Sequence, residues 1–138
     1  MSSLKALQLS DAPFKMKITN PKTGAVMKDK DGKEAFILVK SISSVEATDF
    51  KRQLYEEARK NRKRNKDNGV SYDEVIQRSS EMLADLTEGW YLVDFQGVPI
   101  DEPFSRETAI TVYANPQMDW LKRQVDEAIN DDANFMPT

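Results

Sequence analysis

Residues 118–135 read MDWLKRQVDEAINDDANF and carry the clearest structural pattern in the chain. Successive residues of an α-helix are about 100° apart around its axis, so suitably spaced apolar residues gather on one face. Asp132 would fall in the middle of this face, so the helix is expected to end near Asn130 or Asp131, and Phe135 to pack from a non-helical tail. The segment therefore predicts an amphipathic helix over 116–131 that packs on the core. Its apolar face consists of Met118, Leu121, Val125, Ala128 and Ile129.

Alternation of apolar and polar residues predicts β-structure in the N-terminal third. Phe14, Met16 and Ile18 alternate with lysine and threonine, which is the period-two pattern of a strand with one buried face. A turn sequence, NPKTG, and a later apolar run, FILV, complete a β-hairpin or three-stranded meander over 13–41. Two or three strands are marginally stable alone, so helices must cover one face of them.

Three more helices are expected between the meander and the C-terminal helix. The first follows Ser43 and Glu46, which have the spacing of a capping box, and the second follows Ser71 and Glu74 in the same spacing. The apolar stripe of the second helix includes Tyr72, Val75, Leu83 and Leu86, and Gly89 is expected to end it. The predicted helices span 44–66, 71–88, 105–114 and 116–131.

These elements predict an α+β fold. A β-hairpin or small antiparallel meander is followed by a mainly α-helical bundle of about four helices, in a single domain over 1–138. The aromatic segment 90–95, WYLVDF, is either a short strand or an extended connector between helices. A large aromatic side chain in such a segment is more often core than interface, so Trp90 is expected in the core. Trp120 lies at the edge of the C-terminal apolar face and fits both interpretations.

Composition excludes several classes of function. The chain has 138 residues, no cysteine and no histidine, which removes disulfides, thiolate sites and the commonest general base and metal ligand. Acidic pairs such as Asp126-Glu127 are typical of a solvated face, and the isolated glycines form no phosphate-binding loop. No apolar run approaches the roughly 18 residues needed to span a bilayer, and the first ten residues do not resemble a secretory signal. We expect a cytoplasmic protein with no enzyme activity, cofactor or membrane segment.

The most basic stretch of the chain lies at the end of the first predicted helix. Six positive side chains there could neutralise phosphates and bind nucleic acid. No aromatic residue is interleaved with them, and the whole chain has a formal charge of −3, which favours a solvated helix end over nucleic-acid binding. An acidic protein surface is a third possible contact. The residues concerned are Arg59, Lys60, Arg62, Lys63, Arg64 and Lys66.

The second half of the chain resembles a known family. The residues that carry the resemblance are Gly89-Trp90, Asp94, Gly97, Pro99-Ile100, Phe104-Ser105, the run 120–129 and Ala133-Asn134-Phe135. Together they are similar to the C-terminal half of tail assembly chaperones from long-tailed, siphovirus-like bacteriophages. The turns at 21–24 and 31–32 are similar to the start of the same proteins, whereas the basic segment 59–68 departs from the family pattern.

The resemblance implies a protein made in the host cell cytoplasm and absent from the mature virion. Such chaperones coat the tape measure protein and help recruit tail tube subunits, so the implied partners are the tape measure protein and the major tail tube protein. Apolar faces left unsatisfied on a small domain also predict a homo-oligomer. Alternatives are a nucleic-acid-binding accessory protein that uses 59–66, and a structural head or tail completion protein. Candidate contacts with a partner are Trp120, Leu121, Val125 and Phe135.

Overall fold

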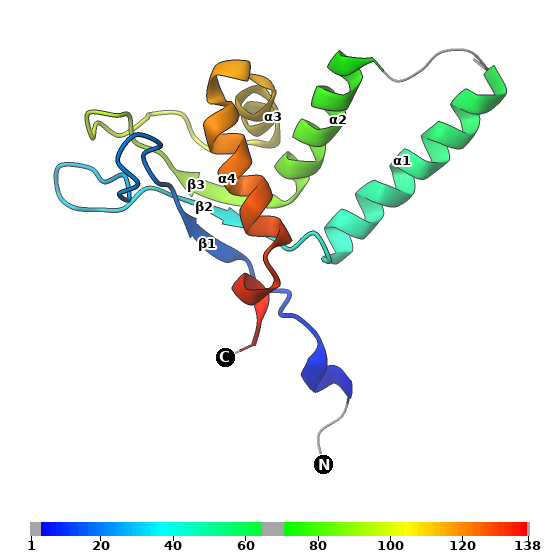
Figure 1. The fold of residues 1–138 in the computed structure, drawn as a ribbon, viewed down its shortest axis with the longest axis horizontal. Helices are drawn as coiled ribbons and strands as arrows, with labels where there is room; N and C mark the ends of the chain where they lie inside the picture. Colours follow the sequence, from blue (N-terminus) through cyan, green and yellow to red (C-terminus); the bar gives the residue numbers. More distant parts are fainter. Residues whose placement is uncertain (1–3, 65–70, 138) are drawn as a thin grey trace.

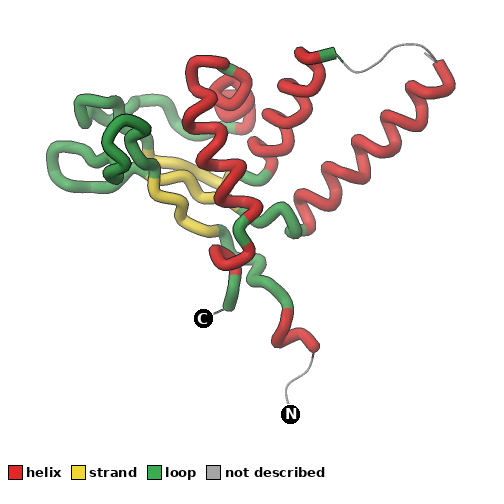
Figure 2. The backbone as a smooth tube through the Cα atoms, viewed as in Figure 1, coloured by secondary structure: helices red, strands yellow, loops and turns green. Residues whose placement is uncertain are grey.

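The computed structural model describes residues 4–64 and 71–137 and has the expected α+β architecture (Figure 1). Three antiparallel strands form one sheet in the order β1-β2-β3, with β2 in the centre. Four α-helices follow or interrupt the strands, with α4 crossing the sheet (Figure 2). The strands are β1 (Phe14–Lys17), β2 (Phe36–Val39) and β3 (Thr87–Tyr91), and the helices are α1 (Val45–Arg64), α2 (Tyr72–Asp85), α3 (Arg106–Ala114) and α4 (Asp119–Asn130).

The third strand of the sheet, β3, lies outside the segment 13–41 in which a three-stranded meander was predicted. Within 13–41, β1 pairs with β2, and the segment between them forms isolated bridges such as Thr19 with Val26. The other edge of β2 is occupied by β3, where Ile37 lies opposite Trp90. The expectation that Gly89 ends a helix was wrong, because α2 ends at Asp85 and Gly89 lies inside β3, opposite Leu38.

The C-terminal helix packs on the sheet as its sequence predicts. Leu121, Val125, Ala128 and Ile129 are all buried, and α4 ends at Asn130. Hydrogen bonds fix its position: the Ile42 backbone N–H donates to the Ile129 carbonyl at 3.0 Å. The Gln124 side chain bonds both the N–H and the carbonyl of Thr19, at 3.0 and 2.8 Å.

The tail after α4 is a short 3-10 helix, Asp132–Phe135, instead of the non-helical segment expected there. Phe135 is 2% exposed, and its ring lies edge-on to that of Phe14 with centroids 6.1 Å apart. The Ser10 backbone N–H donates to the Phe135 carbonyl at 2.6 Å. Phe135 thus closes the core and holds the N-terminal segment.

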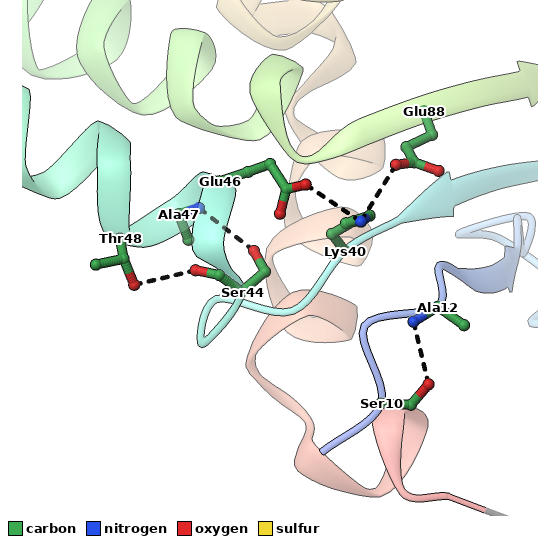
Figure 3. Close-up of polar contacts among 8 residues, drawn as sticks. All are labelled: Ser10, Ala12, Lys40, Ser44, Glu46, Ala47, Thr48 and Glu88. Carbon is green, nitrogen blue, oxygen red and sulfur yellow. Dashed lines mark hydrogen bonds and ion pairs between the residues drawn. The ribbon is translucent and has the colours of Figure 1, made fainter. Parts of the chain in front are cut away.

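The junction between β2 and α1 is held by polar contacts (Figure 3). Lys40 lies between Glu46 of α1 and Glu88 of β3, with Nζ to Oε1 distances of 3.2 and 3.6 Å. Two hydrogen bonds lower the pKa of Glu46. The larger effect comes from the backbone of Glu46 itself, and the second comes from Lys40. The predicted capping role of Ser43 was wrong: the Ser44 hydroxyl accepts from the Ala47 N–H instead, at 3.3 Å.

Helix α1 leaves the rest of the fold beyond its first half (Figure 1). Phe50 is buried and Leu54 half-buried, whereas Tyr55 is 67% exposed. An ion pair between Glu57 and Arg78 connects α1 to α2. The start of α2 is also open to solvent, because Tyr72 and Val75, expected in its buried stripe, are exposed. The buried part of α2 is its C-terminal half, including Leu83, which packs near α3.

Replacing Phe135 with alanine is expected to lower the free energy of unfolding by about 3 kcal/mol, because the change empties a fully buried aromatic site. Urea unfolding followed by circular dichroism measures the loss. Met136→Ala is the control, since Met136 is 62% exposed and its truncation should change stability by less than about 0.5 kcal/mol. Equal effects of the two substitutions would contradict the structural role of Phe135.

Candidate functional site

A cavity of about 510 Å³ lies between the sheet end and helices α3 and α4. Its walls come from β3 and the following loop, from α3, and from the segment that opens α4. This volume is in the range of about 300–1,000 Å³ typical of ligand sites. The side chains that form most of its apolar wall are Trp90, Leu92, Phe95, Val112, Met118 and Trp120.

Two tryptophans, the only ones in the chain, line this cavity. The Trp90 ring meets the Phe104 ring edge-on, with centroids 5.1 Å apart, and its Nε1 donates to the Glu102 carbonyl at 3.4 Å. Trp120 lies against Phe95 with centroids 5.5 Å apart. Both tryptophans are half-buried, so each presents part of its ring to the cavity.

The loop that carries Phe95 is held in one conformation by a tight turn. The Asp94 Oδ1 accepts from the backbone N–H groups of Gln96 and Val98, both at 2.9 Å. Gly97 has a φ of +83°, and a Cβ there would lie 3.0 Å from the Lys28 carbonyl oxygen, so glycine is required. The turn leaves Phe95 58% exposed at the cavity mouth.

The lining is mainly apolar and carries a small number of polar groups. These are Thr108, Thr111, Asn115 and Gln117 and the carboxylates of Asp94 and Glu102. Among the described residues, no group of three or more metal-ligating side chains comes together. No described helix is both long and apolar enough to cross a membrane.

Helix α3, which forms one wall, is tied to β3 by a buried hydrogen bond. Thr87 Oγ1 donates to the Leu83 carbonyl at 2.7 Å and lies 2.7 Å from the Tyr113 hydroxyl. Because the single hydroxyl proton of Thr87 is used there, Tyr113 is the donor to Thr87. Burial raises the pKa of Tyr113 to about 12.

Other shifted groups lie outside the cavity. Lys122 reaches across to α2, where its Nζ donates to the Ser79 hydroxyl at 2.9 Å, and partial burial lowers its pKa. The hydrogen bond between Tyr91 and Asp29 raises the pKa of Tyr91 to about 12 and lowers that of Asp29. These contacts join loops and helices.

The candidate partner contacts differ in how they are placed. Trp120 is half-buried at the cavity, and Leu121 lines it while being only 2% exposed. Val125 and Phe135 are fully buried in the core, so neither of these two candidate side chains is accessible to a partner in this fold. The Asn134 side chain is also engaged, because its Nδ2 donates to the Ala128 carbonyl at 3.0 Å.

The C-terminal end of α1, which carries Arg59 and Lys60, lies on the far side of α2 from α3 and α4, the helices that line the cavity (Figure 1). Arg59 and Lys60 are exposed on α1. Lys66 lies outside the described residues, as do the side chains of the three other basic residues, which belong to α1 by their backbone. Those three are Arg62, Lys63 and Arg64.

Sequence reasoning missed most of the cavity wall. Leu92 and Phe95 were grouped only within a short strand or connector, Ile100 was named only in the family resemblance, and Trp90 was expected in the core. The available signal was the run of large apolar residues before Asp94, followed by a turn sequence. Such a run is too short to be a helix, and one strand cannot bury all of its side chains.

Comparison with known proteins identifies no relative: no family model matches the chain, and neither curated proteins nor solved structures give a significant match.

Replacing Tyr113 with phenylalanine is expected to reduce the loss of stability at alkaline pH. Folding raises the pKa of Tyr113 from 10 to about 12. The protonated Tyr113 therefore contributes its full stabilisation below pH 10, and this contribution is lost as the pH rises towards 12. At pH 11 the wild type should lose about 1.4 kcal/mol through this residue. Urea unfolding of both proteins at pH 8 and pH 11 measures the difference, and equal losses would contradict the assignment.

Proposed function

We propose that the chain is a bacteriophage tail assembly chaperone that binds the tape measure protein and helps recruit tail tube subunits, without remaining in the mature virion. The observation that carries the proposal is the apolar cavity between the two tryptophans. A helical client exposes an apolar face, and a groove of this kind can accept anchor side chains spaced one helical turn apart. The similarity of 89–135 to that family supports the same function.

The surroundings of the cavity mouth suit a macromolecular client better than a small molecule. Phe95, Val98 and Ile100 are 58%, 46% and 43% exposed, so the apolar surface continues from the cavity onto the loop. Exposed apolar residues gathered beside a concavity are typical of interaction sites on soluble proteins. A long client could bind several copies of the chain, and weak contacts of single copies would add through multivalency.

Co-expression with the tape measure protein encoded by the same genome tests this function. We expect the chain to co-purify with its client and keep it soluble. Trp120→Ala and Phe95→Ala should reduce recovery about ten-fold, because aromatic anchors at the centre of an interface carry much of its energy. Tyr55→Ala is the matched control, since Tyr55 is 67% exposed on α1, away from the cavity.

A client that is neither bound nor kept soluble would refute the proposal. Protein gels of purified virions separate a chaperone from a structural completion protein, because the chaperone should be missing from the particles.

Nucleic-acid binding is a second candidate, favoured by one observation. Arg59 and Lys60 are exposed on the part of α1 that projects from the fold. If this function holds, DNA or RNA should bind at micromolar protein. The affinity should fall steeply between about 50 and 200 mM salt, because binding releases the cations condensed on the nucleic acid and this release is less favourable at high salt. Arg59→Gln with Lys60→Gln should weaken binding and flatten the salt dependence. Fluorescence anisotropy measures both, and absence of salt-sensitive binding rejects this candidate.

A further inference from the structure

The charged side chains that line the cavity are all acidic. Its lining includes the carboxylates of Asp94 and Glu102 and no lysine or arginine. Neither carboxylate forms an ion pair with any described residue. Asp94 uses Oδ1 in the turn, and no described residue donates to its other carboxylate oxygen. Two negative charges therefore stand beside an apolar recess without a neutralising partner.

The basic residues of the C-terminal half make contacts elsewhere. Residues 71–138 contain 14 acidic and 4 basic residues. Arg78 pairs with Glu57 and Glu81, Arg106 with Asp85, and Arg123 with Asp119. The fourth, Lys122, is hydrogen-bonded to Ser79 between α4 and α2. Lys28, whose backbone approaches the turn at Gly97, also forms no ion pair with Asp94 or Glu102, so both carboxylates remain available to a cationic partner.

We infer that the cavity recognises an amphipathic helix whose apolar face is flanked by lysine or arginine, an inference that rests on the proposed function. The apolar anchors enter between Trp90 and Trp120, and the cationic side chains lie beside Asp94 and Glu102. Apolar contact supplies affinity, whereas complementary charge supplies selectivity and orientation along the client. Segments of the client with acidic flanks are rejected, because their charges would meet like charges at the rim.

Two synthetic helices test the inference directly. Each has about 18 residues, or five helical turns, with leucines at i, i+4, i+7 and i+11 and no tryptophan. One carries lysine beside the leucines and the other glutamate. Because both tryptophans of the chain line the cavity, its intrinsic fluorescence reports binding at this site.

The lysine peptide is expected to bind about ten-fold more tightly than the glutamate peptide at low salt, with the difference shrinking as salt rises. In the double variant Asp94→Asn with Glu102→Gln, the preference should fall below about two-fold. Asparagine keeps the Oδ1 acceptor that the turn needs, and urea unfolding checks that the variant is folded. Asp126→Asn with Glu127→Gln makes the same charge change on the exposed face of α4 and should keep the preference.

Three results with the peptides would overturn the inference: equal binding of the two peptides, no binding of either, or a preference that survives Asp94→Asn with Glu102→Gln. Self-association that is lost in this variant would also overturn it, because the cavity would then hold a second copy. Tape measure binding without a lysine preference refutes this inference alone, whereas a lysine preference without tape measure binding refutes the proposed function alone.

Discussion

The fold depends on the burial of one face of a short central strand. Ile37 and Val39 of β2 are both 0% exposed, and four-residue strands cannot exclude water from such side chains by themselves. Helix α4 lies against β2 and supplies Val125 and Ile129, also 0% exposed, to the same core. The backbone hydrogen bond between Ile42 and Ile129 fixes the helix relative to the strand. Every other element is placed around this contact.

The cavity is a consequence of how the chain completes the sheet. The loop after Tyr91 connects β3 to α3, and together with residues of α3 and of the start of α4 it forms the wall of the cavity. Asp94 and Gly97 define the turn of this loop, which places Phe95 against Trp120. The recess is therefore shaped by hydrogen bonds within the fold, and a preformed site loses little conformational entropy when it is filled.

The molecule separates its two charged regions in space. The exposed basic residues Arg59 and Lys60 lie on α1, whereas the carboxylates of Asp94 and Glu102 line the cavity; α2 separates the end of α1 from α3 and α4 (Figure 1). The body between them is joined by internal contacts such as Lys40 with Glu46 and Glu88, which also tie the start of α1 to the sheet. Surface contacts of this kind are individually weak, so they orient α1 more than they stabilise the whole protein.

The sequence alone predicts the α+β class, the C-terminal end of α4 and the burial of its apolar face, because periodicity follows directly from helix geometry. It also located the Ser71 cap of α2. The start of α4 was not predicted, since residues 116–118 form a separate 3-10 helix. The tertiary structure decided which strand completes the sheet, since pairing of β2 with residues 87–91 is a non-local contact with no local signal. It likewise decided that Phe135 is too deeply buried to meet a partner, that Tyr72 and Val75 are exposed, and that Trp90 and Trp120 share a cavity. Periodicity reports which face of an element is apolar, but only packing determines what covers that face.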